Sequence, residues 1–426
     1  MKTREATGKT MPSMLRNISW LGVANGLVKP VWFIFITAVC MRLLGVREYG
    51  VMAAAMSLGM IAAAFIDLGM TQYTIREVSR EPSRASRFFS NFLALRLANA
   101  SAAWAAAICA GLLLGYEGLS LVAVVFAGAY ALALNLTNYC RSIYRAFEDL
   151  RQEAVMLILE KFLVVALGLV LLITTRLAAW TLAGMAVGMV LATGANAWWI
   201  DRRFATLSAR LLSWKFLRES LVVMVPFGLA GVFTVVYYRV DMVMIEAFLG
   251  EAPTGQYGAA FRILEGLNVL PAIVSLAAVY PRLAKLHHAA SFGRFNSLLS
   301  RSLLGTVAVS LLVTVGLFYL ASPIIRLLDP DPAYGPAADA LRILVWSFPF
   351  LCANMLLYAA LISMEAQRFV SAALGTAVVV NVGLNFYLIP AYGIMGAAVA
   401  TIIPEVVLLG VYGCRYLIGR RRWSNQ

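Results

Sequence analysis

Two stretches without charged residues, LSLVAVVFAGAYALALNLTNYC (residues 119–140) and LAAWTLAGMAVGMVLATGANAWWI (residues 177–200), show what kind of fold the sequence specifies. A helix needs roughly 20 mostly apolar residues to cross the hydrocarbon core of a bilayer, and each stretch has that length. The whole chain agrees, since 62% of its residues are hydrophobic and only 13% are charged, against about 25% charged residues in soluble domains. The mean hydropathy of the chain is +0.81. A chain this apolar cannot form the solvated surface of a soluble enzyme or a soluble binding domain, so both classes are excluded.

Twelve mostly apolar segments of about this length cover most of the chain. A spanning helix and a short connection together use about 30 to 36 residues, so the 426 residues accommodate about 12 spans and leave little for a domain outside the membrane. We therefore predict an all-α, polytopic membrane protein. The segments lie near residues 17–41, 51–69, 89–115, 119–140, 155–175, 177–200, 219–245, 257–280, 299–321, 338–363, 369–389 and 394–417.

The basic residues predict how these helices are oriented. A formal net charge of +14 would suggest nucleic acid in a soluble chain. Here Lys and Arg gather at the two ends of the chain and in the even-numbered connections, whereas the odd-numbered connections contain only Arg42, Arg47, Arg176, Arg239 and Arg326. Because basic loops stay on the cytoplasmic side, we expect both termini in the cytoplasm and no nucleic-acid partner.

A short motif occurs twice, about half a chain apart. Residues 44–50 read LGVREYG, and Leu249-Gly250 is separated by six residues from Tyr257-Gly258. Each copy follows the first helix of a group of six, which indicates two six-helix lobes with the same orientation. Transporters built from such parallel repeats have a central cavity between their lobes. We predict an N-terminal lobe over residues 1–200, a linker over 201–218 and a C-terminal lobe over 219–426.

The linker belongs to the longest polar connection, residues 201–220. Its apolar residues alternate at helical spacing with basic residues, and Trp198 and Trp214 lie at its two ends. This pattern is typical of a helix that lies in the membrane interface, so we predict a cytoplasmic interfacial helix.

Lys29 is the first candidate functional residue, because a charge at the centre of a spanning helix costs about 2.5–3.5 kcal/mol. It lies at the midpoint of the first segment, directly before Pro30. Gly22, Asn25, Gly26 and Lys29 follow at positions i, i+3, i+4 and i+7, so small and polar residues share one face of this helix. We expect this face to line a watery cavity, with a structural ion pair of Lys29 as the alternative.

Three arginines are further candidates for a cationic cavity. Arg96 lies about two turns into the third segment, where its side chain either faces the cavity or reaches the interface. Arg239 lies beside a stripe of small and polar residues in the seventh segment, formed by Gly231, Thr234, Tyr238 and Asp241. Arg262, in the eighth segment, precedes Glu265 by three residues, so an ion pair within the helix is the alternative there.

Three acidic residues, Asp241, Glu265 and Glu405, are candidates for taking up a coupling ion. Glu405 lies at the midpoint of the twelfth segment without a basic neighbour in its own helix. It therefore either pairs across helices, with Lys29 as one candidate, or is protonated. The five cysteines and two adjacent histidines do not have the spacing of metal ligands, and no nucleotide-binding motif is present. We expect neither a cofactor nor an enzyme activity.

Several short stretches resemble a known family when they are taken in their order along the chain. They are NISWL (17–21), RLLGVREYG (42–50), DLGM (67–70), REVSR (76–80) and GQYGAAFR (255–262). The sequence resembles the Wzx-type polysaccharide flippases of the multidrug/oligosaccharidyl-lipid/polysaccharide exporter superfamily.

The resemblance implies a V-shaped exporter that flips an undecaprenyl-diphosphate-linked oligosaccharide from the cytoplasmic to the periplasmic leaflet by alternating access. The oligosaccharide would be a repeat unit of O-antigen, capsule or exopolysaccharide. Lys29, Arg96, Arg262 and Arg239 would hold the diphosphate, and Asp241, Glu265 or Glu405 would take up H⁺ or Na⁺. The implied location is the inner (plasma) membrane, and the implied partners are the polysaccharide polymerase and the glycosyltransferases.

Two alternatives remain open from the sequence. A cation-coupled multidrug exporter of the same superfamily is favoured if the cavity is apolar and acidic. An integral-membrane glycan polymerase or ligase, which belongs to a different class, needs a large outer loop with catalytic residues. The longest outer connection, around residues 322–336, is short.

Overall fold

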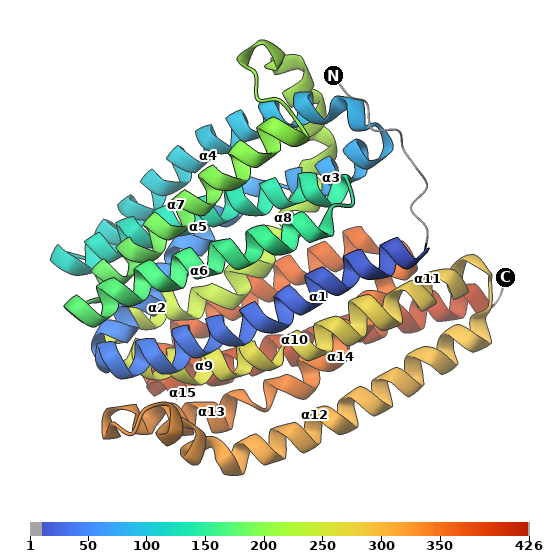
Figure 1. The fold of residues 1–426 in the computed structure, drawn as a ribbon. Helices are drawn as coiled ribbons and strands as arrows, with labels where there is room; N and C mark the ends of the chain where they lie inside the picture. The colour runs from blue at the N-terminus through green and yellow to red at the C-terminus, as the bar shows by residue number, and fades with distance from the viewer. Residues whose placement is uncertain (1–10, 425–426) are drawn as a thin grey trace. The chain divides into compact units, whose positions relative to one another are not determined.

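The computed structural model of the protein describes residues 11–424, which form helices and short connections without a β-strand (Figure 1). The all-α fold class that the sequence predicts is confirmed. Lys2, Arg4 and Lys9, which contribute to the predicted orientation, lie outside the described residues.

The contacts within the chain divide it into two compact units. Unit 1 comprises the described part of residues 1–39 together with residues 62–228, and unit 2 comprises residues 40–61 and the described part of 229–426. The predicted lobes differ from these units at two places. Residues 40–61 belong to unit 2, although they precede the predicted boundary, and the linker with the first part of the next helix belongs to unit 1.

Unit 1 is a group of long helices in which α5, α6 and α7 pack side by side and α1 packs on α6 (Figure 1). Two glycines bring α7 close to α6: a Cβ on Gly184 would lie 2.8 Å from the carbonyl carbon of Leu167, and one on Gly188 would lie 2.6 Å from the carbonyl oxygen of Leu163. Small residues favour such close helix packing in membranes. The helices are α1 (Met11–Ile34), a π-helical turn (Phe35–Val39), the end of α2 (Cys40–Asp67), α3 (Met70–Arg80), α4 (Ala85–Leu113), α5 (Gly118–Ala146), α6 (Leu150–Thr175) and α7 (Ala178–Arg203).

The predicted interfacial helix over residues 201–218 is wrong. Helix α7 ends at Arg203, α8 begins at Trp214, and only the 3-10 turn Ala209–Leu211 lies between them. The physical reason is that side chains of α4 bind the backbone of the connection and replace the bonds of a helix. Ser90 accepts from the Ser208 N–H at 3.0 Å, and Asn91 donates to the Leu211 carbonyl at 2.7 Å.

Unit 2 contains the first part of α2 and the helices after residue 228, of which α14 packs against both α12 and α15 (Figure 1). The helices are α8 (Trp214–Leu249), α9 (Glu251–Leu267), α10 (Val269–Ala272), a π-helical stretch (Ile273–Val279), α11 (Tyr280–His288), α12 (Phe292–Leu328), α13 (Gly335–Leu344), α14 (Ser347–Ser363) and α15 (Gln367–Ser424).

The two copies of the repeated motif have the same backbone shape and cross each other within unit 2. Gly45 (φ 72°, ψ 173°) and Gly250 (φ 83°, ψ −168°) both adopt a conformation open to glycine. Five residues after each, Gly50 and Gly255 meet so closely that a Cβ on Gly50 would lie 2.8 Å from the Gly255 nitrogen. This crossing explains why residues 40–61 pack with unit 2.

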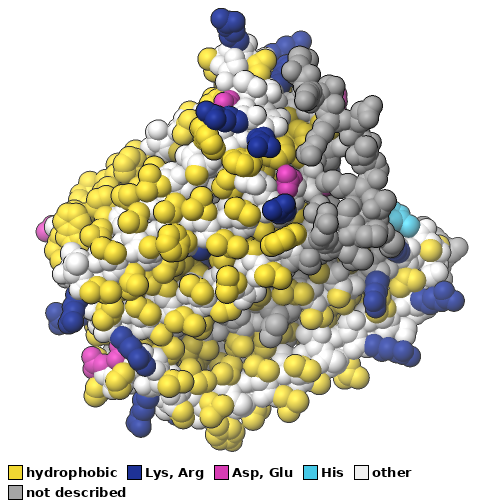
Figure 2. Space-filling model, in the orientation of Figure 1, with side chains coloured by type: hydrophobic (Ala, Val, Ile, Leu, Met, Phe, Trp, Pro, Cys, Tyr) yellow, Lys and Arg dark blue, Asp and Glu magenta, His cyan; other side chains and the backbone are white. Residues whose placement is uncertain are grey.

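Among the described residues, seven helical runs are long and apolar enough to cross a membrane, and two bent pairs raise this to as many as nine. Two of the seven runs, Trp20–Arg80 and Gln367–Arg420, contain the non-helical Gly45 and Gly393, where the sequence analysis divides them into separate spans. Figure 2 shows hydrophobic side chains over most of the visible face and Lys and Arg mainly near its margins. The chain is a multi-pass membrane protein, and the number twelve stays a prediction.

Candidate functional site

Lys29 lies on an exposed part of α1. Its neighbour Val28 is buried against Leu157 of α6, whereas the Lys29 side chain is exposed and makes no ion pair with another described residue. Helix α1 continues through Pro30 and then widens into the π-helical turn Phe35–Val39, a type of irregularity that is frequent at functional sites. Lys29 therefore offers a cation that no described carboxylate neutralises.

Arg96 is fully buried in unit 1 and its guanidinium group is occupied. It forms an ion pair with Asp67 and donates to Asn135 Oδ1 at 2.5 Å and to Thr71 Oγ1 at 2.8 Å. The guanidinium also lies over the ring of Tyr139, 4.5 Å from its centre. Arg96 thus joins the end of α2, α3 and α5 to its own helix, α4.

Arg239, Arg262 and Glu265 form an ion triad in unit 2. Arg262 donates to Glu265 Oε2 at 2.7 Å within α9, as the spacing of three residues predicts, and Arg239 of α8 binds Oε1 of the same carboxylate. Two cations from neighbouring helices thus bind one carboxylate. The structure brings together three of the predicted site residues here.

Asp241 lies in a buried cluster of oxygen-bearing side chains from α8, α9 and α15. Asn385 donates to Asp241 Oδ1 at 2.6 Å, while the Tyr257 and Thr401 hydroxyl groups bond Oδ2, each at 3.1 Å. Asn381, one turn before Asn385, accepts from it at 3.2 Å. No group of three or more His, Cys, Asp or Glu suited to a metal ion occurs among the described residues. The cluster suits a proton or a monovalent cation better than a transition metal, because its ligands are one carboxylate and neutral oxygens.

Glu405 of α15 is buried and held by neutral partners. Asn354 donates to Glu405 Oε2 at 2.7 Å, and the Tyr237 hydroxyl donates to Oε1 at 3.0 Å. These hydrogen bonds hold the carboxyl group across helices, but the partners carry no charge, and no ion pair of Glu405 occurs among the described residues.

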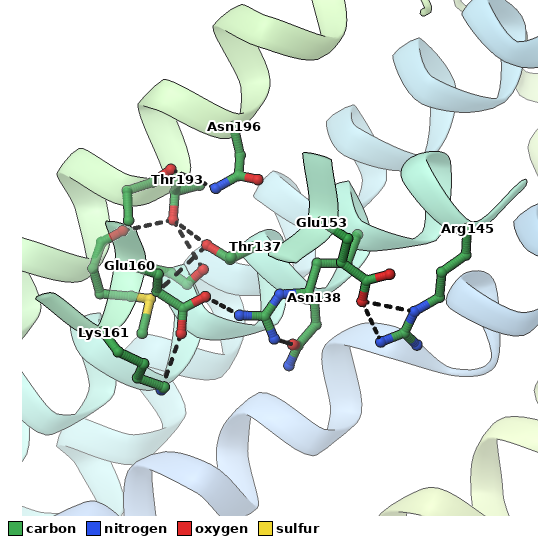
Figure 3. A network of polar contacts seen from close by, with 12 residues as sticks. Thr137, Asn138, Arg145, Glu153, Glu160, Lys161, Thr193 and Asn196 are labelled. Carbon is green, nitrogen blue, oxygen red and sulfur yellow. Dashed lines mark hydrogen bonds and ion pairs between the residues drawn. The ribbon is translucent and has the colours of Figure 1, made fainter. Parts of the chain in front are cut away.

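A further charged network, which the sequence analysis did not single out, lies between α5 and α6 (Figure 3). Glu160 is fully buried between Arg141, which binds its Oε2, and Lys161, whose ammonium lies 3.0 Å from its Oε1. One turn further along α5, Arg145 donates to Glu153 Oε1 at 2.7 Å. The sequence contains an indication of this network. Glu160 and Lys161 lie inside the predicted segment 155–175, and placing their charges in a spanning helix costs as much free energy as placing that of Lys29.

The fold and these clusters define a multi-pass helical membrane protein with charged groups held inside its spans, as in membrane transporters. The family model described as "Polysaccharide biosynthesis protein" matches residues 14–287, and the chain belongs to this family. A second model, MatE, matches residues 226–387.

Solved structures share the fold over nearly the whole chain. An inward-facing multidrug resistance MATE family transporter of the MOP superfamily has a TM-score of 0.74 at 16% identity, covering 97% of this chain and 98% of its own. The lipid II flippase MurJ, in an inward closed conformation, has a TM-score of 0.74 at 15% identity, covering 95% and 89%. The chain therefore has the fold of MOP superfamily transporters, as its resemblance to this superfamily implies.

Among curated proteins, an uncharacterized membrane protein of Methanocaldococcus jannaschii is 27% identical over 191 residues. The match spans 44% of this chain and 44% of that relative, so it supports common ancestry of a part of the two chains only.

Proposed function

We propose that the protein flips a polyisoprenyl-diphosphate-linked oligosaccharide, of the undecaprenyl type, from the cytoplasmic to the periplasmic leaflet of the plasma membrane. The observation that carries the proposal is Lys29, an exposed cation in an apolar helix of a chain that belongs to a polysaccharide biosynthesis family. A diphosphate is the anionic part of such a substrate, and it would offset the cost of keeping this charge in the membrane. Arg239 and Arg262, the other arginines that the resemblance assigns to the diphosphate, lie together at Glu265 in unit 2.

Arg96 has a different part in this proposal. Because Asp67, Thr71 and Asn135 already bind its guanidinium, its charge supports the fold of unit 1, and Lys29 is the substrate contact that this proposal assigns to that unit.

The coupling ion, H⁺ or Na⁺, would bind at the Asp241 cluster. A cation there would balance the charge of the buried carboxylate. A ligand shifts a conformational equilibrium by the difference between its affinities for the two states. Release of the cation would therefore favour the opposite state of an alternating-access cycle. Both termini would lie in the cytoplasm, and the polymerase and glycosyltransferases of the same polysaccharide would be the functional partners.

A cation-coupled multidrug exporter is the second candidate, favoured by one observation. The MatE model matches residues 226–387, which include Asp241, and Glu405 adds a second buried carboxyl group in unit 2. A polymerase or ligase has less support. Residues 322–336 form the end of α12, a 3-10 turn at Pro332–Tyr334 and the first residues of α13, which leaves little room for a catalytic loop.

The test is a deletion strain that carries no second flippase. We expect it to lack the surface polysaccharide and to retain lipid-linked repeat units on the cytoplasmic leaflet, and a plasmid copy should restore export. Normal polymer export in the deletion strain would refute the proposal. Drug hypersensitivity together with normal export would favour the multidrug exporter.

A further inference from the structure

The network between α5 and α6 contains a lysine that nothing in the proposed function uses. Lys161 contacts Glu160 at 3.0 Å and lies over the ring of Trp32, 4.6 Å from its centre. Its side chain is 16% exposed, whereas Glu160 is fully buried. Of the two cations on Glu160, Lys161 is slightly more exposed than Arg141, whose side chain is 13% exposed, so a ligand can reach the lysine.

The charges in the network are unequal. Arg141 and Lys161 share the single carboxylate of Glu160, so one positive charge is left over inside an apolar helix pair. Figure 3 shows the pair of Lys161 and Glu160. Arg141 has a second partner, Asn138, whose Oδ1 accepts at 3.0 Å, and this bond fixes its guanidinium. The ammonium of Lys161 has no second carboxylate among the described ion pairs, and its flexible stem and three donors allow it to exchange partners.

The surroundings of Lys161 indicate the ligand's chemistry. Trp32 of α1 is stacked on Tyr130 of α5, with ring centres 6.3 Å apart and planes at 8°. Lys29 lies three residues before Trp32 and thus on the neighbouring turn of α1. Two lysines near a partly exposed aromatic ring suit a ligand that carries phosphate oxygens next to a sugar ring or an apolar chain.

We propose that Lys161, on Trp32 and beside Glu160, binds a phosphate oxygen of the lipid-linked substrate together with Lys29. Arg141 keeps Glu160 in place while Lys161 turns to the phosphate, and Glu160 takes Lys161 back when the substrate leaves. This subsite rests on the proposed function, because it names the part of unit 1 that holds the anionic end of that substrate.

The test measures binding to the full chain in nanodiscs. The probes are undecaprenyl diphosphate, the neutral polyisoprenol of the same length, and inorganic pyrophosphate as a competitor without the lipid. Lys161→Met should fold, because Glu160 keeps Arg141. Removing one charge-assisted contact should weaken undecaprenyl diphosphate binding about tenfold and leave polyisoprenol binding unchanged. Glu160→Gln should tighten diphosphate binding, since Lys161 then has no carboxylate to leave.

The matched control is Lys215→Met, which removes an exposed lysine at the start of α8 and should bind like the wild type. If Lys161→Met binds undecaprenyl diphosphate like this control while Lys29→Ala weakens binding, the subsite is refuted and the proposed function stands. If the wild type binds the diphosphate no better than polyisoprenol, the proposed substrate class fails, and the subsite fails with it. Competition by pyrophosphate alone, equally in wild type and Lys161→Met, would place the phosphate contact elsewhere.

Discussion

Replacing Arg96 should destabilise the protein rather than remove a substrate contact. The Arg96→Met variant has a side chain of similar length without charge, and it leaves Asp67 Oδ1 without its cation and Asn135 Oδ1 without its donor. Breaking a buried ion pair by removing one partner costs about 3–5 kcal/mol. The Asp67 side chain is 34% exposed, so water can solvate part of its charge, and we expect a cost near the lower end, about 3 kcal/mol. That corresponds to about a hundredfold change in the folding equilibrium constant.

The assay compares abundance in the membrane and thermal unfolding in detergent for a set of variants. Arg96→Met should be less abundant and unfold at a lower temperature than the wild type. The double variant Arg96→Met with Asp67→Asn should recover part of the loss, because no unpaired carboxylate remains. Lys29→Met is the matched control, since Lys29 is exposed, and it should unfold like the wild type.

Transport per folded molecule decides between the two roles of Arg96. A structural role predicts that transport by Arg96→Met falls in proportion to its abundance. Wild-type abundance and unfolding temperature together with lost transport would refute the reasoning, and Arg96 would then belong with Lys29 as a substrate contact.

The other predictions concern charge, coupling and orientation. Lys29→Arg should retain part of the transport and Lys29→Ala should lose it at near-normal abundance, because diphosphate binding requires a positive charge; full transport by Lys29→Ala in a complemented deletion strain would contradict this. Asp241→Asn should abolish the dependence of transport in proteoliposomes on a Na⁺ or H⁺ gradient, since the amide cannot balance a cation, and an unchanged gradient dependence would move the coupling ion elsewhere. Single cysteines at the exposed positions Glu117 and Pro332 should react with an impermeant maleimide from outside in a variant without native cysteines, and a cysteine at Arg210 only after permeabilisation; outside labelling at Arg210 would overturn the predicted orientation.

The sequence predicts best where interacting residues are close along the chain. Arg262 and Glu265 are one turn apart in α9, and their pairing follows from the helical repeat. Arg96 and Asp67 are 29 residues apart, and no local pattern indicates which of the many polar residues will face a buried guanidinium. For this reason the sequence groups Arg96 with Lys29 as cavity cations, whereas the structure gives them different surroundings.

The length of α5 accounts for the network that the sequence analysis missed. The predicted segment ends at residue 140, so Arg141 and Arg145 count there as loop residues that fix orientation. Helix α5 in fact continues to Ala146, and both arginines form ion pairs with glutamates of α6. Figure 3 shows the pair of Arg145 and Glu153. A charged residue at the end of a span can therefore both set the orientation of the helix in the membrane and bind a neighbouring helix. The apolar pattern of the sequence alone does not separate these two roles.

The places where the chain passes between the two units are as informative as the charged residues. The chain leaves unit 1 after Val39, at the end of the π-helical turn Phe35–Val39, and Gly45 interrupts the helix shortly afterwards. An alternating-access cycle requires segments that absorb changes in backbone angles where two moving bodies are joined. A widened helical turn and a glycine with positive φ are suited to this, because neither depends on an uninterrupted ladder of i to i−4 hydrogen bonds. The Gly50–Gly255 crossing, in contrast, is too close to admit a side chain, so residues 46–61 should move with unit 2, and at this first of the three passages between the units the bending should fall within residues 35–45.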